Sequence, residues 1–226
     1  MCSKFTLKTT SVDILKELAE LDTDLSVSSH KKTIDFDNEY FPSVVAPVIV
    51  NDHGAMKLTP MKFALVPSWS TEAKPKFATH NARIETILDK PTWRKPFVSN
   101  HCVIPMTGFY ESVYEGPLKG HVIKFEGVNQ RILYTTGIYD FWQDKEKPEN
   151  SFFSFSILTR DPSTFILDHG HDRTPIFIDK KFIPAWLQNK LSTGEIMKSQ
   201  LLANAYHPEL TVQIDRPLKA GWEKRI

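Results

Sequence analysis

The sequence predicts one mixed α+β domain, built on a mainly antiparallel, barrel-like β-sheet with flanking helices. The chain has 226 residues, of which 41% are hydrophobic and 24% charged, which suffices for one hydrophobic core and is ordinary for a globular protein. Short β-type runs separated by Pro, Gly and Asn dominate after residue 44, and few segments have helical periodicity. No internal repeat or low-complexity linker is visible, so residues 1–226 are expected to form a single domain.

The first predicted element is an amphipathic helix over about residues 11–21. Thr10 and Asp13 have the spacing of a capping box, and apolar residues follow at helical intervals. The polar residues 22–40 are predicted to form a loop. Further helices are predicted at Pro91–Val98, Lys181–Asn189 and Gly194–Leu202.

Short apolar or alternating runs predict the strands. The charged stretch Gln143–Asn150 is expected to be an exposed hairpin loop between two of them. The predicted strands are Val45–Val50, Met61–Val66, Cys102–Pro105, Val122–Phe125, Ile132–Tyr139, Phe152–Thr159, Thr174–Ile178 and Leu210–Ile214.

Charge and cysteine content narrow the functional class. Lys and Arg number 28 against 27 Asp and Glu, so a protein that coats long DNA duplexes is disfavoured, while a short nucleic-acid footprint stays open. The two cysteines, Cys2 and Cys102, form no disulfide framework and fit a reducing cytoplasm. Neither a CxxC nor an HExxH motif is present, and no apolar run approaches the length of a membrane helix. We therefore expect no metal, no cofactor and no membrane segment.

Cys2 is the first candidate for chemistry. If Met1 is removed, as is common before a small residue, Cys2 carries an α-amine and a thiol on adjacent carbons. An aldehyde can condense with the amine to an imine, and the thiol can then close a five-membered thiazolidine ring. An internal cysteine cannot do this. The alternative interpretation is that a cysteine at this position has no role.

The terminal amine is also the better nucleophile near neutral pH. Its reference pKa is about 7.7 to 8.0, against about 10.4 for lysine. At about pH 7.4 roughly a quarter of the amine is therefore neutral, against about 0.1% of a lysine. Thiolate character would add to this advantage.

Two internal segments offer polar side chains after or before apolar runs. In the segment 79–86, Asn81 can orient an amine or a phosphate and Arg83 can bind a phosphate bidentately, unless Asn81 merely caps a helix. In the segment 103–111, an apolar strand ends at Gly108 and then presents Glu111. This carboxylate is either solvated after a turn or partly buried, with a raised pKa suited to acid–base catalysis.

The segment 168–175 contains two histidines. His169 and His171 suggest a metal site, but no third ligand is evident in the sequence. One histidine could instead transfer protons near neutral pH while Arg173 binds an anion. The alternative is a polar turn that precedes a strand.

Together these segments resemble the SOS response-associated peptidase family, also called abasic-site processing proteins. Members begin with Met-Cys-Gly-Arg and then carry WGLIPxW-like, NARxET, VPxxGFYEW and HxRMP segments in that order. Five segments in the right order, spread over nearly the whole chain, make the resemblance specific. Their counterparts are Met1–Lys4, Phe63–Trp69, Asn81–Thr86, Val103–Ser112 and His171–Pro175.

The resemblance implies a distorted β-barrel core with a positively charged groove, and covalent capture of an abasic site in single-stranded DNA during the DNA damage or SOS response. By motif position, Cys2 would form the cross-link and Asn81 would position its amine. Glu111 would help to open the deoxyribose ring, and His171 would assist the imine chemistry. The DNA contacts expected are Lys4, Trp69, Arg83, Arg94 and Arg173.

The chain departs from the family pattern at several DNA-facing positions. Ser3-Lys4 replaces Gly-Arg, so a forked arginine becomes a point charge. The other departures are Phe63-Ala64 for Trp-Gly, His101 for a common Arg, Ser112 for Trp and Thr174 for Met. All four expected catalytic positions are retained, so we expect the core chemistry to survive with altered DNA contacts.

Two other functions fit the same residues. An N-terminal-nucleophile cysteine peptidase or autoprotease would use the Cys2 thiol for acyl transfer. A module that only binds single-stranded DNA would have lost the chemistry. In each case we expect a cytoplasmic monomer, which would associate with the nucleoid when bound to damaged DNA.

Overall fold

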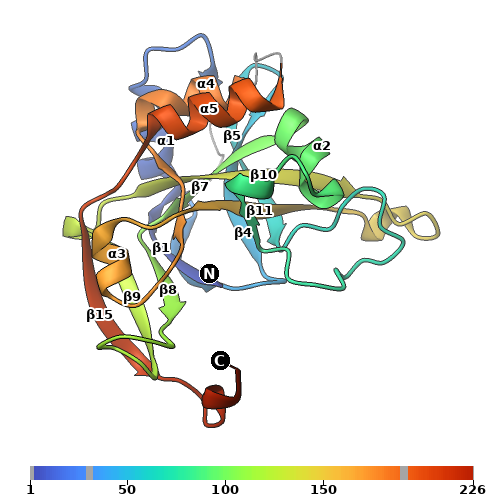
Figure 1. Cartoon of the computed structure of the whole chain (residues 1–226). Coiled ribbons are helices and arrows are strands. Elements are labelled where there is room, and N and C mark those ends of the chain that lie inside the picture. The colour runs from blue at the N-terminus through green and yellow to red at the C-terminus, as the bar shows by residue number, and fades with distance from the viewer. Residues whose placement is uncertain (1–2, 29–32, 189–192, 226) are drawn as a thin grey trace.

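The centre of the molecule is a closed ring of five strands. The computed structural model describes residues 3–28, 33–188 and 193–225. The ring runs β11–β5–β4–β7–β10, and β10 pairs back to β11 (Figure 1). Among the five pairings of the ring, only that of β5 with β11 is parallel. Closure pairs each ring strand on both sides. The ring strands are β4 (Val45–Asp52), β5 (Ala55–Phe63), β7 (His101–Met106), β10 (Leu133–Trp142) and β11 (Phe152–Arg160).

Short strands extend the ring beside the carboxyl end of β11. There β6 (Asn81–Arg83) pairs in parallel with one edge of β11, and β12 (Thr174–Pro175) pairs antiparallel with it. Both meet Thr159, which lies opposite Arg83 on one side and opposite Pro175 on the other. Further short strands are β2 (Ser26–Val27) on β5, β13 (Phe177–Ile178) on β10 and β14 (Ala205–Tyr206) on β13.

A second, antiparallel sheet has the order β15–β9–β8–β1–β3. Thr107 alone connects β7 of the ring to β8 of this sheet. Gly108 follows, and a Cβ there would lie 2.7 Å from the carbonyl oxygen of Phe125, so only glycine fits this close approach. The strands are β1 (Lys4–Thr10), β3 (Asp35–Tyr40), β8 (Gly108–Ser112), β9 (His121–Gly127) and β15 (Leu210–Pro217).

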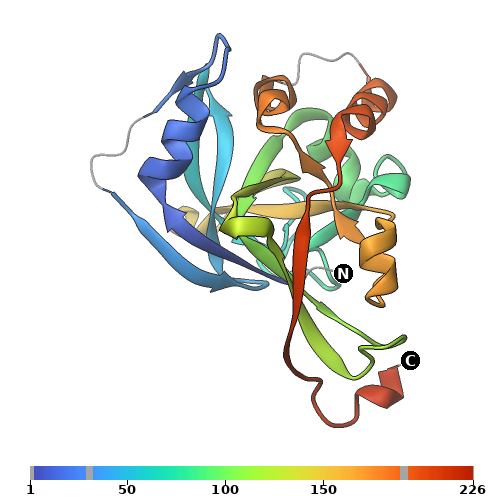
Figure 2. The same cartoon turned by 90° about the vertical axis from the view of Figure 1, so that its left-hand side faces the viewer.

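The α-helices lie outside the strands. In Figure 2, α1 (blue) lies apart from α4 and α5 (orange to red). Thr10 is confirmed as the N-cap of α1, because its hydroxyl accepts a hydrogen bond from the Asp13 backbone N–H at 3.1 Å. The described helices are α1 (Ser11–Ala19), α2 (Pro91–Ser99), α3 (Thr164–Asp168), α4 (Ile183–Gln188) and α5 (Gly194–Asn204).

The fold class is confirmed, as are most of the apolar strands and the hairpin loop 143–150 between β10 and β11. The prediction of a loop over 22–40 is wrong at β3. Its alternate residues Phe36 and Tyr40 are buried, while Asp35, Asp37 and Glu39 point outward. The acidic residues on one face made the segment look like a polar loop, although pairing with β1 stabilises it as a strand.

Three local predictions need correction. Asn81 is not a helix cap, because it lies in β6 and the following 3₁₀ helix η1 (Ile84–Thr86) has no side-chain cap. Glu111 lies within strand β8, not after a turn. The strand expected at Met61–Val66 begins at Ala55 and ends at Phe63, where Ala64 takes a φ of 86°. Asn189, the expected last residue of a helix, lies outside the described residues.

Candidate active site

A buried acid–base pair joins two of the sequence motifs. The Glu111 carboxylate oxygen Oε2 lies 3.0 Å from His171 Nε2. Both residues are almost fully buried, with 2% and 6% of their surface exposed. Strand β8 delivers Glu111, whereas His171 follows α3 and Gly170, which takes a φ of 84°. The contact brings a general acid–base group and a proton carrier within direct transfer distance.

The second ring nitrogen of His171 has partners suited to either charge state. Nδ1 lies 3.0 Å from the carbonyl oxygen of Arg173 and 3.3 Å from its backbone nitrogen. A neutral ring, protonated at Nε2 toward Glu111, can accept the Arg173 N–H. An imidazolium can donate from Nδ1 to the Arg173 carbonyl. The ring can therefore gain and lose a proton without losing its position.

Strand β11 pairs with the strands that carry the Asn81 motif and the end of the His171 motif. Asn81 is buried and pairs in register with Ile157, on the opposite edge from β12, which continues the His171 segment. His80, next to Asn81, packs edge-on against Phe63 at 5.9 Å between ring centroids. Burial lowers the pKa of His80, although the charge of Glu111 opposes this shift. The imidazole is therefore neutral at physiological pH.

Arg173 braces the site from within. Its guanidinium donates to both carboxylate oxygens of Glu85, at 3.0 and 2.8 Å, and to Asp161 at 2.9 Å. Burial, the largest single effect, raises the pKa of Glu85, but the Arg173 hydrogen bonds, a backbone hydrogen bond and the charges of Arg173 and Arg83 together hold that pKa below its usual value. Arg173 is itself 5% exposed. Its guanidinium is thus engaged by protein carboxylates where the sequence predicted a phosphate contact.

The other expected DNA contacts lie nearer the surface. Lys4 places its ammonium 3.6 Å from the centroid of the Tyr110 ring and 2.9 Å from Glu39. Arg83 and Arg94 are exposed, and Arg94 also donates from Nε to the carbonyl of Leu88. Trp69 is 62% exposed. Two guanidiniums and an aromatic ring thus lie at the surface, whereas the Lys4 ammonium is paired with Glu39.

Trp69 shares its surroundings with a second exposed aromatic residue. It lines a hollow together with Phe77, which is 57% exposed. Sequence reasoning missed Phe77, Glu85 and Asp161. The one signal for Phe77 in the sequence is that it is an aromatic residue in a polar stretch near Pro75. Asp161 has no such signal, because its relevance comes from its contact with Arg173.

Cys2 lies outside the described residues. The first strand begins at Lys4, which is paired with Tyr110, the neighbour of Glu111. The other cysteine, Cys102, is fully buried in β7, as expected for a small hydrophobic residue, and burial raises the pKa of its thiol. Cys102 is therefore no competitor for the role of nucleophile.

His101, which stands where the family commonly has an arginine, serves the core. Its ring stacks on Trp186 at 3.7 Å between ring centroids, and its nitrogens contact the carbonyls of Phe97 and Trp186.

Within the described residues, no cluster of His, Cys, Asp and Glu side chains has the arrangement of a metal site. Nor does any helix in that part of the chain have the length and apolarity needed to cross a membrane.

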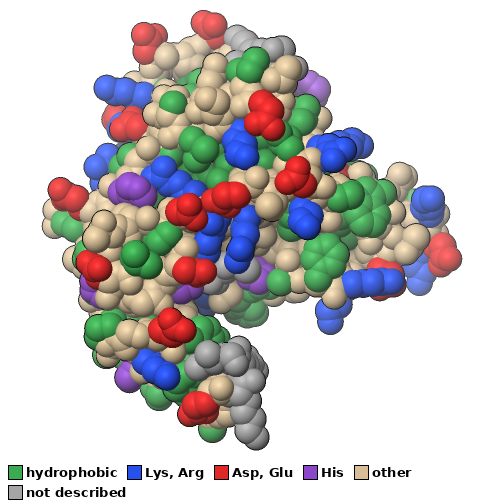
Figure 3. All heavy atoms as spheres, in the orientation of Figure 1, with side chains coloured by type: hydrophobic (Ala, Val, Ile, Leu, Met, Phe, Trp, Pro, Cys, Tyr) green, Lys and Arg blue, Asp and Glu red, His purple; other side chains and the backbone are tan. Residues whose placement is uncertain are grey.

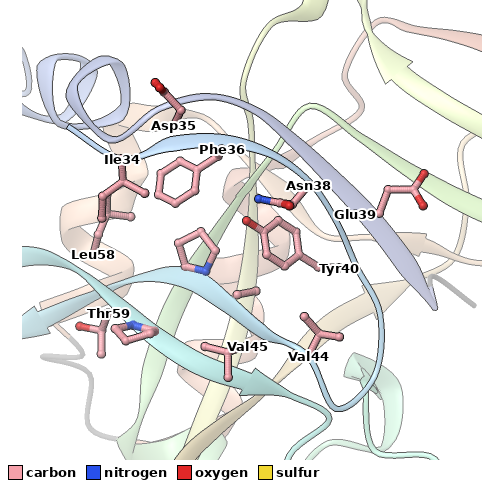
Figure 4. Close-up of a pocket in the computed structure, with 13 residues that line it drawn as sticks. Ile34, Asp35, Phe36, Asn38, Glu39, Tyr40, Val44, Val45, Leu58 and Thr59 are labelled. Carbon is pink, nitrogen blue, oxygen red and sulfur yellow. The ribbon is translucent and has the colours of Figure 1, made fainter.

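A separate hollow of about 440 Å³ lies between β3 and the β4–β5 pair. Figure 4 shows Phe36 and Tyr40 turned toward Leu58, while the carboxylates of Asp35 and Glu39 point away. Burial raises the pKa of Tyr40, so its hydroxyl stays protonated. The hollow is apolar and does not bring together the groups needed for acid–base chemistry.

Comparison with known proteins identifies the family. The model of the family described as "SOS response associated peptidase (SRAP)" matches residues 1–214. The chain belongs to the SRAP family. It is 30% identical over 207 residues to abasic site processing protein YoqW of Bacillus subtilis, covering 89% of this chain and 86% of that protein. It is 26% identical over 187 residues to abasic site processing protein HMCES of Xenopus tropicalis, covering 71% and 55%.

The fold of the SRAP family is also found in solved structures. A crystal structure of a protein from Bacteroides thetaiotaomicron has a TM-score of 0.70 and 22% sequence identity, and the match covers 95% of this chain and 92% of the other. The similarity confirms the expected SRAP-like barrel. In this chain Glu111 and His171, from two of the family's motifs, form an ion pair, and the strands that carry Asn81 and Thr174 both pair with β11.

Proposed function

We propose that this protein processes abasic sites in single-stranded DNA by forming a thiazolidine cross-link through Cys2. The observation that carries the proposal is the buried Glu111–His171 pair at the strand next to β1. Lys4, which is two residues from Cys2 in the chain, pairs with Tyr110, the neighbour of Glu111, and this supports assigning the acid–base pair to the reaction of Cys2. The relatives YoqW and HMCES are named abasic site processing proteins.

The reaction begins on a closed sugar. An abasic deoxyribose is mostly a cyclic hemiacetal, so ring opening moves a proton from the anomeric hydroxyl to the ring oxygen. Glu111 is the group we assign to that transfer, because its carboxylate is buried and already contacts a proton carrier. The product is an aldehyde at the carbon that lost its base.

The terminal amine then attacks the aldehyde carbon. The carbinolamine loses water to give an imine, and the Cys2 thiolate adds to the imine carbon as the nitrogen takes up a proton. Overall, one C–N and one C–S bond form and one water leaves. His171 would move protons in these steps, since its ring is held in both charge states. Asn81, which is buried in β6, would orient the amine without competing for its proton.

The surrounding side chains would hold the strand. Arg83 and Arg94 are exposed, and no carboxylate of the described residues forms an ion pair with either, so we assign them to phosphates. Trp69 would stack on a base. Lys4 would add a positive charge at the start of β1, although it is shared with Glu39. Arg173 we assign instead to positioning, because it joins Glu85 to the backbone that holds His171.

The test is incubation with an oligonucleotide that carries one abasic site. A heat-stable adduct is expected with single strands, much slower formation with duplexes, and none with undamaged DNA. The intact mass of the protein establishes whether Met1 has been removed. Equal rates on duplex and single strand would contradict the single-strand assignment. Peptide cleavage without an adduct would favour the peptidase, and salt-sensitive reversible binding alone a DNA-binding module.

A further inference from the structure

A second group of cationic side chains lies beyond Arg83, at the end of β11. It surrounds a hollow of about 460 Å³. Two of its lining residues, Ile84 and Glu85, directly follow Arg83 in the chain. The hollow is therefore adjacent to the position at which the proposed function places a DNA phosphate. Its other lining residues are Arg160, Asp161, Pro162, Lys198, Leu202 and His207.

Arg160 is half-buried, and in the described part of the chain no carboxylate is bonded to it. One terminal nitrogen donates to the carbonyl of Tyr206 at 3.2 Å and lies 3.0 Å from His207 Nε2. Its Nε is buried and has no hydrogen-bond partner among the described residues. Burial lowers the pKa of both Arg160 and His207, and the Arg160 charge adds to the shift of His207. An anion would compensate such a partly desolvated cation.

The carboxylates that face the hollow are already engaged. Glu85 and Asp161 both bond to Arg173. Lys198 donates to the backbone carbonyl of Glu85 at 3.2 Å. Among the lining residues, Arg160 and Lys198 balance Glu85 and Asp161, with His207 neutral. The buried Arg173 behind them bonds to both carboxylates, so Arg160 and Lys198 have no acidic partner of their own.

We propose that this hollow binds a backbone phosphate of the single strand, next to the phosphate held by Arg83. The inference rests on the proposed function, which places the strand. Arg160 and Lys198 would each supply a positive charge and a hydrogen-bond donor. Figure 3 shows Lys and Arg side chains mixed with Asp and Glu side chains in the middle of one face of the molecule.

The experiment measures the affinity of the full chain for undamaged oligonucleotides of increasing length, as a function of salt. Arg160→Met keeps the packing of the stem and removes the charge. It should weaken the binding of longer strands roughly tenfold and reduce the slope of log K against log salt by about 0.7. Lys198→Met should act in the same direction. Arg131→Met, at an exposed arginine of the neighbouring hollow, is the matched control and should change neither quantity.

Three further results decide the outcome. Unchanged affinity and salt slope in both variants, with thermal unfolding showing that they are folded, overturn the site. Inorganic phosphate is the free-anion probe: if Arg160→Met abolishes phosphate binding but leaves DNA binding unchanged, the ligand is a free anion and the DNA assignment is wrong. Absence of any adduct with abasic DNA, together with the expected loss in the variants, would overturn the cross-linking chemistry while supporting the phosphate site.

Discussion

Replacing Arg173 with methionine separates the structural interpretation of this residue from the one that the sequence predicts. As a phosphate contact, Arg173 could be removed with a loss of DNA affinity and little effect on stability. In the structure its guanidinium is buried and donates to Glu85 at 3.0 and 2.8 Å, to Asp161 at 2.9 Å and to Thr159 at 3.3 Å. Methionine keeps an unbranched apolar stem and removes all four hydrogen bonds.

The magnitude follows from the exposure of the partners. Breaking a fully buried ion pair costs about 3–5 kcal/mol. The side chains of Glu85 and Asp161 are 41% and 85% exposed, so water compensates part of the loss. We therefore expect Arg173→Met to lower the free energy of unfolding by about 2–3 kcal/mol. For a chain of this size the melting temperature should fall by roughly 4–12 °C.

The loss should also depend on pH. The folded-state pKa of Glu85 lies below its ordinary value, because the hydrogen bonds and charge of Arg173, with a backbone hydrogen bond and the charge of Arg83, together outweigh the effect of burial. This contribution to stability is fully present above the unfolded pKa of about 4.3 and disappears as the pH falls through the folded pKa. The difference between wild type and Arg173→Met should thus be constant from about pH 7 to 5 and shrink below about pH 4.

Urea unfolding followed by tryptophan fluorescence measures both effects. Arg83→Met is the matched control, since Arg83 is exposed and its loss should change the stability by no more than about 0.5 kcal/mol while weakening DNA binding. If Arg173→Met were as stable as wild type at every pH and weakened DNA binding like Arg83→Met, the bracing role would be refuted.

Three other predictions concern the chemistry directly. Cys2→Ser keeps an amine but cannot close the ring, so its adduct should not survive heating; Cys102→Ser is the control and should cross-link normally, and the opposite result would reverse the assignment. Glu111→Gln and His171→Ala should each slow adduct formation at saturating DNA by roughly 10²-fold or more without loss of affinity; unchanged time courses would leave both with structural roles. Gly170→Ala should cost more than about 1 kcal/mol and slow the adduct, because its φ is 84° and a Cβ would lie 2.5 Å from a neighbouring carbonyl oxygen; an unchanged melting temperature would contradict this packing.

The sequence by itself determined the features that depend on neighbouring residues. The capping box at Thr10 and Asp13 specified the start of α1, and the apolar runs predicted β10, β11 and the hairpin between them. The order of the motifs was enough to indicate the family that the comparisons confirmed. These signals survive without the fold because caps, alternation and motif spacing are local properties of the chain.

Only the tertiary structure decided what the polar residues touch. The acidic segment Asp35–Tyr40 became a strand because β1 pairs with it, which no local pattern shows. The sequence places Glu85 and Arg173 88 residues apart, yet their ion pair turns an expected DNA contact into an internal brace. Glu111 and His171 meet in the same way. Hydrogen bonds and ion pairs stabilise a side chain according to the partner and the water around it, and the folded chain alone supplies both.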